Sequence, residues 1–143
     1  MHVTDLPINK ALGMQLAAQG STHLLDLPES PLALNHLGTI HASAQFALAE
    51  ACSGEFLIQS LGEEAEQIFA VLRTSEVKFR KPAQSNLRAT ARVATETFAS
   101  MVEELVARGR VLVPLDVQIA DTNGVTTMSG QFTWFLQKQS AAS

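Results

Sequence analysis

One stretch of the sequence, residues 35 to 56, places a carboxylate where a buried helix is expected. It reads NHLGTIHASAQFALAEACSGEF, and no charged residue lies between His41 and Glu50. A carboxylate in apolar surroundings has its pKa raised, because burial disfavours the charged form. Such a group suits a general base or a nucleophile, so Glu50 is the first candidate for catalysis. The alternative is a glutamate that points to solvent at a gap in a sheet.

The helical neighbours of Glu50 are small. Ser43, Ala47 and Gly54 share its face at i−7, i−3 and i+4. Small neighbours leave space beside the carboxylate, and we expect a substrate to occupy it.

His41 and Glu50 cannot meet within one chain if both lie on one helix. Nine residues at about 100° each place them about half a turn apart and about 13 Å apart along the axis. If both serve one site, a second copy of the chain must bring its own helix alongside. We therefore expect a homodimer with two equivalent sites.

The start of this helix offers hydrogen-bond donors. The backbone N–H groups of Ala42 and Ser43 lack partners within the helix and lie at the positive end of its dipole. They are candidates for an oxyanion hole that binds a carbonyl oxygen. His41 is a candidate site residue, with capping of the helix as its alternative role. Asn35 either orients water or a carbonyl group, or serves only a turn.

The hydrophobic pattern predicts the elements that position these residues. Residues 41–61 contain no proline, carry apolar or small residues on almost every side, and predict a buried central helix that ends at Gly62. Residues 67–82 and 87–93 alternate with period two and predict two strands.

Two further helices and a strand follow from local signals. Apolar residues at i, i+3 and i+4 spacing in 98–108 predict an amphipathic helix capped by Gly109. Pro7 begins a short helix that Gly13 limits, and the next apolar run reads as a strand stopped by Pro28.

The last third of the sequence predicts a hairpin, because Asn123-Gly124 separates two alternating runs and is typical of a two-residue type I′ turn. If Thr122 faces Val125, every inward pair is apolar or contains glycine. The pairs are Ile119–Met128, Val117–Gly130, Leu115–Phe132, Val113–Trp134 and Val111–Leu136. A slip of one residue would turn these side chains to solvent, so the register is strongly specified. Pro114 predicts a bulge or a nitrogen at a sheet edge.

The elements follow one another as helix, strand, long helix, two strands, helix and two strands. This order predicts an α+β fold in which an antiparallel sheet curls around one central helix. A chain of 143 residues suits a single domain, 1–143, and residues 138–143 are expected to form a disordered tail.

Composition excludes several classes of protein. The net charge of −4 argues against binding of nucleic acid, and no apolar run is long enough to cross a membrane. The single Cys52 cannot form an internal disulfide, and the start lacks the pattern of a signal peptide, so we expect a cytoplasmic protein with a buried structural thiol. The histidines and acidic residues show no metal-ligand spacing, and no metal is expected.

The sequence resembles a known family, the hotdog-fold acyl-CoA thioesterases, specifically those of the phenylacetic-acid-degradation type. Asn35, Gly38, His41 and Glu50 match the spacing at the start of that family's helix. VKFRKPAQSNLRATARV and GRVLVPLDVQIADTNG resemble its strand–proline–strand segment and its penultimate strand. The resemblance implies a hotdog fold, composite sites in a dimer, and hydrolysis of an acyl-CoA or acyl-carrier thioester.

The resemblance also implies roles. Glu50 either attacks the thioester carbonyl or activates water, and the sequence leaves both open. Asn35 and His41 are the other catalytic candidates. The residues expected at the oxyanion hole or substrate are Ala42, Ser43 and Gly38. No cofactor is implied beyond the coenzyme A of the substrate, and the implied partner is a second copy, in a homodimer or a tetramer.

Basic residues alternate onto the outward face of the predicted sheet. Arg80, Lys81 and Arg88, with Lys78, are candidates for binding the phosphates of coenzyme A. The alternative is a solvated face without a ligand.

The chain departs from the family pattern at two places. Ala42-Ser43 stands where the family has Gly-Gly, and the helix of residues 97 to 108 is longer than the usual strand connection. The first departure favours an alternative, a hotdog domain that binds an acyl thioester without hydrolysing it. A third possibility is a dehydratase of 3-hydroxyacyl thioesters, for which neither His23 nor His36 fits clearly.

Overall fold

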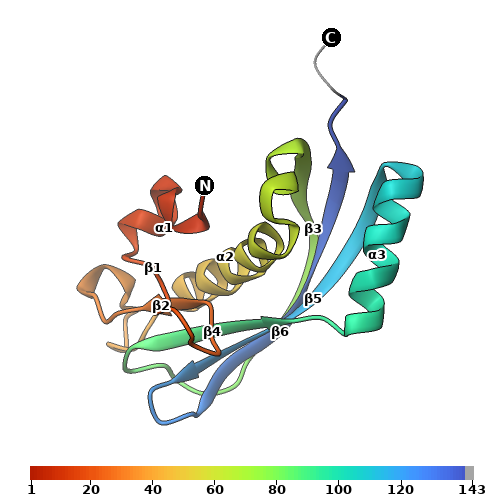
Figure 1. Ribbon diagram of the computed structural model, residues 1–143. Helices are drawn as coiled ribbons and strands as arrows, with labels where there is room; N and C mark the ends of the chain where they lie inside the picture. The colour runs from red at the N-terminus through yellow and green to blue at the C-terminus, as the bar shows by residue number, and fades with distance from the viewer. Residues whose placement is uncertain (141–143) are drawn as a thin grey trace.

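Six antiparallel strands form one sheet, and a long helix lies against one of its faces (Figure 1). The computed structural model describes residues 1–140. The strands are β1 (Gln15–Leu16), β2 (Leu25–Leu27), β3 (Ile68–Phe79), β4 (Leu87–Arg92), β5 (Arg110–Asp121) and β6 (Thr126–Lys138). The helices are η1 (Val3–Asp5), α1 (Pro7–Ala11), η2 (Pro31–Ala33), α2 (Ala42–Leu61), η3 (Gly62–Gln67) and α3 (Thr95–Arg108). The strand order is β1-β2-β4-β5-β6-β3, which confirms the predicted hotdog architecture.

Helix α2 forms where it was predicted because its residues favour helix and both ends are specified. Alanine is the best helix former and dominates the first half. The His41 side chain accepts a hydrogen bond from the N–H of Ser43 at the start. Gly62, with φ of 59°, ends the helix, since a residue with a side chain rarely adopts that conformation.

The register of the β5–β6 hairpin is confirmed. All five predicted inward pairs are present, among them Ile119–Met128 and Leu115–Phe132. Phe132, Leu115 and Ile119 are fully buried. Period-two alternation specifies this register because a shift by one residue would exchange the buried and solvent faces.

The predicted type I′ turn is wrong. Asn123 does not have the positive φ that this turn requires, whereas Gly124 has φ of 82°. The N–H of Gly124 donates to the carbonyl of Asp121 at 3.0 Å, and Oδ1 of Asp121 accepts from the N–H groups of Asn123 and Val125. This Asx geometry favours a turn centred on Thr122-Asn123, followed by glycine in the left-handed region.

A bulge restores the register beyond this turn. Ala120 pairs with Thr126, but Ile119 pairs with Met128, so Thr127 is the extra residue of β6. The Thr127 side chain is fully buried, and its carbonyl accepts from the N–H groups of Arg80 and Lys81. The turn shifts the pairing of β5 with β6 by one residue, and the bulge shifts it back. The predicted register therefore holds from Ile119–Met128 onward.

Pro114 lies at an open edge and not at a bulge. Its pairing with Thr133 is continuous with its neighbours on β6. The β4–β5 pairing ends at Arg92 and Asp116, so β5 has no strand neighbour beside Pro114 on the other side. An edge position tolerates a residue that lacks an N–H group.

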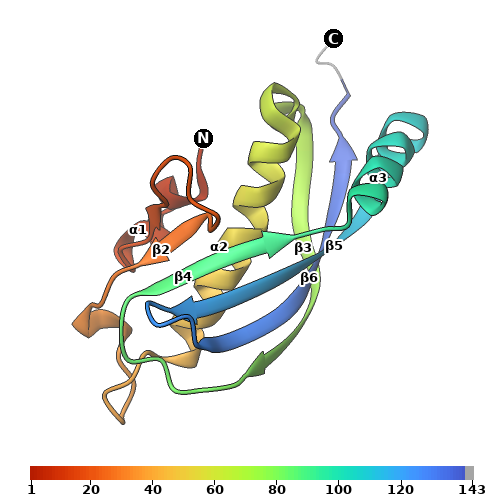
Figure 2. The same ribbon diagram turned by 60° about the horizontal axis from the view of Figure 1, so that its bottom comes forward.

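Strand β3 forms one edge of the whole sheet, as Figure 2 shows. It is twelve residues long, and Phe69 and Val71 are exposed on it. A long, apolar edge strand offers a row of unpaired backbone groups to another chain.

The amino-terminal elements lie on the same side of the sheet as α2 (Figures 1 and 2). The expected helix at Pro7 and strand before Pro28 are present as α1 and β2. Strand β1 was not predicted, since two residues carry no periodicity. At the other end Lys138 belongs to β6 and the N–H of Gln139 donates to Gln67, so the expected tail begins after these residues. Its last residues, 141–143, lie outside the described residues.

The buried side chains form two clusters on the α2 side of the sheet. The larger joins α2 to β2, β4, β5 and β6 and includes Phe132, whose ring centroid lies 5.5 Å from that of Phe46. The smaller joins α3 to β5 through Met101 and Leu105. Helix α3 therefore buries only part of the predicted apolar face, since Val102 and Val106 are exposed.

Candidate functional site

Glu50 lies in the middle of α2, on a strip of the helix that the sheet does not cover. Ala47 and Ile58 on this strip are also only partly buried. Burial raises the pKa of the Glu50 carboxyl above its ordinary value. Among residues 1–140 no side chain or backbone group donates a hydrogen bond to this carboxylate, so it is free to accept a proton.

Two apolar depressions lie along α2, one before Glu50 and one after it, and Glu50 itself lines neither. One, of about 400 Å³, lies between α1, η2 and the first half of α2, with His41, Ser43 and Ala47 on its wall. The other, of about 280 Å³, lies beside the second half, between Leu57 and Trp134. Volumes near 300 Å³ are at the lower end of those of small-molecule sites.

Val3 and Trp134 pack beside Gly54. A Cβ on Gly54 would meet Cγ1 of Val3 at 3.4 Å and Cζ2 of Trp134 at 3.5 Å. Gly54 nevertheless borders an open depression, as do Ser43 and Ala47. That a substrate occupies the space beside these small residues stays a prediction.

The two backbone donors at the start of α2 differ. The N–H of Ser43 donates to Nδ1 of His41 at 2.9 Å. The N–H of Ala42 has no acceptor among the described residues, and Ala42 is exposed. One donor of the predicted pair is therefore free, and the other is occupied by the capping histidine.

Asn35 and Gly38 belong to a closed loop just before α2. Oδ1 of Asn35 accepts from the N–H groups of Leu37 and Thr39, and its Nδ2 donates to Oγ1 of Thr39 at 2.8 Å. Gly38 has φ of 76°, which the turn requires. In this arrangement the Asn35 amide is engaged by its own loop.

A second glutamate of α2, Glu55, was missed by the sequence reasoning. Its side chain is fully buried, and its oxygens lie 2.6 Å from Nδ1 of His2 and 3.0 Å from the donating N–H of Val3. Nε2 of Gln59 donates to the same carboxylate. Five residues from Glu50 correspond to about 140° around the helix, so the spacing alone could have placed Glu55 on another face.

Cys52 is buried on the sheet side of α2. Burial, with the Glu55 carboxylate as a smaller cause, raises the pKa of its thiol to about 12. A thiolate is the nucleophilic form, so this thiol is inert at neutral pH. The expected structural role of Cys52 agrees with this environment.

The other candidates lie away from Glu50. Nε2 of His23 lies 2.9 Å from Oδ1 of Asp26 near β2, and His36 is exposed in the loop before α2.

Oε1 of Gln45, in the first turns of α2, is buried without a hydrogen-bond partner among the described residues.

The predicted phosphate-binding residues lie at the turn end of the sheet. Nε of Arg80 donates to Oγ of Ser129 at 2.7 Å, and Arg88 pairs in register with Ala120. Both arginines, and Lys81, are exposed. Since Leu87 and Ala89 point to the core, Arg88 lies on the face of the sheet opposite to α2.

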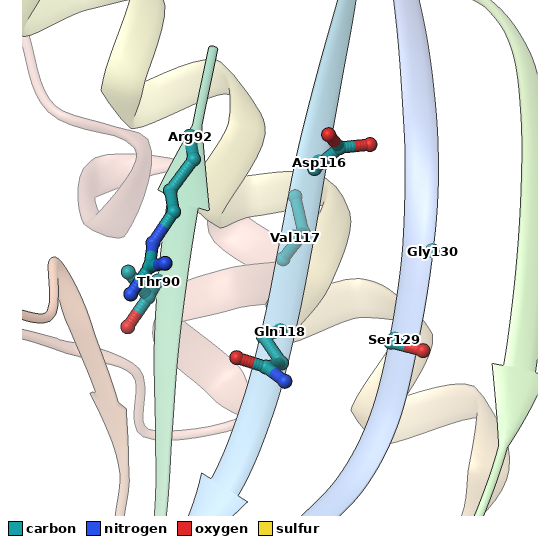
Figure 3. A pocket seen from close by; sticks show the side chains of 7 residues that line it. All are labelled: Thr90, Arg92, Asp116, Val117, Gln118, Ser129 and Gly130. Carbon is teal, nitrogen blue, oxygen red and sulfur yellow. The ribbon is translucent and has the colours of Figure 1, made fainter. Parts of the chain in front are cut away.

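Figure 3 shows a shallow polar depression on this outer face, with Thr90 and Arg92 on β4 and Asp116 and Gln118 on β5. Gly130 borders it on β6. The residues alternate with buried neighbours, which is the pattern of a solvated sheet face.

Residues 1–140 contain neither a cluster suited to a metal ion nor a helix suited to a membrane. No cluster of three or more histidine, cysteine, aspartate or glutamate side chains is arranged to hold a metal ion there. No helix in that range is both long and apolar enough to span a membrane.

A family model described as a domain of unknown function, DUF4442, matches residues 15–136. The chain belongs to this family. The match covers the sheet and α2, and so includes Glu50 and the start of its helix. A comparison with curated proteins finds no match.

Solved structures share the fold of this DUF4442 protein. A Pseudomonas aeruginosa protein described as a probable thioesterase has a TM-score of 0.81 at 21% identity, over 96% of this chain and 91% of that one. A Chlorobaculum tepidum protein of unknown function has a TM-score of 0.83 at 17% identity, over 94% and 88%. A Bacillus halodurans protein solved with coenzyme A has a TM-score of 0.68 at 18% identity, over 90% and 74%.

Proposed function

We propose that this DUF4442 protein is a thioesterase that hydrolyses an acyl-CoA or acyl-carrier thioester, with Glu50 as the catalytic carboxylate. The observation that carries the proposal is the placement of Glu50, a partly buried carboxylate with a raised pKa and no internal partner, between two apolar depressions. An acyl chain is apolar, so either depression suits it. The finer assignment to enzymes of the phenylacetic-acid-degradation type rests on the spacing of Asn35, Gly38, His41 and Glu50.

The reaction needs a base or a nucleophile and no further cofactor. As a base, Glu50 takes a proton from water while the water oxygen bonds to the thioester carbon. The tetrahedral intermediate then collapses, the carbon–sulfur bond breaks, and the thiolate leaves with the proton that Glu50 held. As a nucleophile, Glu50 bonds to the thioester carbon, the carbon–sulfur bond breaks and the thiolate leaves; water then hydrolyses the anhydride to the free acid and restores the Glu50 carboxylate.

The N–H of Ala42 is the proposed donor to the carbonyl oxygen. It is exposed, lies at the positive end of α2, and forms no hydrogen bond within residues 1–140. The N–H of Ser43 joins it only if His41 turns away. Asn35 joins the site only if its amide leaves Thr39.

Glu50 and Ala42 must come from two copies of the chain if they act on one substrate. Eight residues of helix separate them by about 12 Å along the axis, too far for both to touch one carbonyl group. The exposed edge strand β3 offers a surface on which a second copy can extend the sheet. We therefore propose a homodimer with two composite sites.

Arg80, Lys81 and Arg88 remain the proposed phosphate contacts of coenzyme A. Arg88 lies on the face of the sheet opposite to α2, so a substrate that contacts both it and Glu50 would have to pass around an edge of the sheet. The coenzyme A in the Bacillus halodurans structure supports this class of ligand.

A second candidate function is binding of an acyl thioester without hydrolysis. The observation that favours it is the occupied N–H of Ser43, which leaves one backbone donor where an oxyanion hole commonly has two.

The test is release of free thiol from short, long and aromatic acyl-CoAs, measured for wild type, Glu50→Gln and Glu64→Gln. Glu64 is an exposed carboxylate just after α2 and serves as the matched control. We expect wild-type hydrolysis that falls by about 10²-fold or more in Glu50→Gln and is unchanged in Glu64→Gln. Activity that survives in Glu50→Gln removes Glu50 from the mechanism. Binding of acyl-CoA without turnover supports the second candidate.

A further inference from the structure

Half of the arginines of the chain gather around one depression on the outer face of the sheet. Arg73 on β3, Arg108 at the end of α3 and Arg110 at the start of β5 line a space of about 300 Å³, with Phe135 and Leu112 as its apolar part. Arg110 and Leu112 alternate with the buried Val111 and Val113 of β5, so the depression opens on the face of the sheet opposite to α2.

Arg73 occupies a position that only a bulge provides. Leu72 pairs with Trp134 and Thr74 with Thr133, so Arg73 is an extra, unpaired residue of β3. The guanidinium carbon of Arg73 lies 5.1 Å from the centroid of the Phe135 ring. A bulge re-aims a side chain, and here it places a cation over an aromatic ring.

The cations of this depression are not neutralised by ion pairs. In the part of the chain that the structure describes, the two ion pairs are His2–Glu55 and His23–Asp26, and neither involves an arginine. One carboxylate, Glu104, borders the depression. An excess of positive charge therefore gathers here in a chain whose net charge is −4.

Stabilisation of α3 explains only part of this arrangement. Arg108 and Arg110 lie next to the carboxyl end of α3, where positive charge is favourable. Arg73 comes from another strand, and neither it nor the exposed Leu112 beside Phe135 contributes to that effect.

We propose that this depression binds a mononucleotide phosphate, either a free nucleotide or the nucleotide end of coenzyme A. Guanidinium groups match phosphate oxygens in a bidentate manner. The base stacks on the free face of the Arg73 guanidinium and contacts Leu112, since planar bases stack on arginine. The volume and the combination of cations with one aromatic ring fit this class of ligand.

Calorimetric titration of the full chain with ADP tests the proposal. Arg73→Ala and Arg110→Ala each weaken ADP binding by about tenfold, as expected for loss of one charge-assisted contact. Arg92→Ala, which removes an exposed arginine of the same face outside the depression, changes it by less than about twofold. Absence of ADP binding at millimolar concentration overturns the proposal, as does an equal loss in Arg92→Ala. Pyrophosphate that binds as tightly as ADP overturns the role of the base.

Kinetics with acyl-CoA distinguish a free nucleotide from the nucleotide end of coenzyme A. If this depression holds the nucleotide end of the substrate in place of Arg80, Lys81 and Arg88, Arg73→Ala raises KM for acyl-CoA and leaves kcat unchanged. If it holds a free nucleotide, ADP binds while KM stays at the wild-type value. Both results support the proposal, and ADP binding is measured without hydrolysis, so its outcome does not depend on the proposed thioesterase activity.

Discussion

Glu50 and Glu55 lie five residues apart on α2 and have opposite surroundings. The Glu55 carboxylate is fully buried and contacts His2 and the N–H of Val3, whereas the Glu50 carboxylate is partly open and has no partner among the described residues. One carboxylate is therefore available for chemistry, and the other holds the amino-terminal segment on the helix.

The first prediction concerns the pH dependence of activity. A general base must be ionised, and burial raises the pKa of Glu50 above its ordinary value of 4.5. Hydrolysis should therefore rise with pH along an acid limb whose midpoint lies above 4.5. The check is a kcat profile measured from pH 4 to 8. A rate that is already maximal at pH 4 contradicts the role of Glu50 as a base.

The second prediction concerns stability. Because its pKa is raised on folding, Glu50 favours the folded state at low pH, and this contribution is lost as pH rises through the folded pKa. Glu50→Gln should equal or exceed wild type in free energy of unfolding at pH 7 and lose this advantage at pH 4. Urea unfolding at both values measures it, with Glu64→Gln unchanged as control. The assignment is contradicted if the stability of Glu50→Gln relative to wild type is lower at pH 7 than at pH 4.

The third prediction concerns Glu55. Glu55→Ala removes the acceptor of the buried N–H of Val3 and the contact with His2, and an unsatisfied buried donor costs about 1–3 kcal/mol. We expect a loss of about that size in urea unfolding. Proteolysis should also become faster in residues 1–12, which border both depressions beside Glu50. Wild-type stability and protection would show that the contact is dispensable.

The fourth prediction contrasts two glycines, Gly130 on β6 and Gly54 on α2. A Cβ on Gly130 would lie 2.7 Å from the carbonyl oxygen of Glu76 and from Cγ1 of Val77, so Gly130→Ala should cost about 3 kcal/mol by forcing β3 from β6. Gly54→Ala makes contacts of 3.4 Å or more and gains helix propensity, so its stability should be unchanged or higher. Equal effects in urea unfolding would contradict the packing described here.

Much of this fold could be predicted from the sequence, because its signals are periodic. The alternation of β5 and β6 specifies the Ile119–Met128 register, and the uninterrupted apolar run specifies α2. The turn type could not be predicted, since it depends on the hydrogen bonds that the Asp121 side chain makes.

The candidate site was predictable in its residue types but not in its contacts. The occupied N–H of Ser43 depends on a rotamer of His41, and the packing beside Gly54 depends on Val3 and Trp134, which are distant in sequence. Arg73 lies beside Arg108 and Arg110 because of a bulge in β3, which no local sequence pattern predicts.

The central claim is a composite site made of Glu50 from one copy and the N–H of Ala42 from the other. It can be tested by complementation between two inactive variants. Ala42→Pro deletes this N–H at the first helical position, where proline is favoured, and His41 already has the extended conformation that precedes proline. Alone, Ala42→Pro and Glu50→Gln should each lose about 10²-fold or more in hydrolysis. Dimers re-formed from an equal mixture contain one intact site in each mixed pair, so about a quarter of wild-type activity should return. A mixture as inactive as the separate variants would show that both groups act within one copy, and would contradict the account.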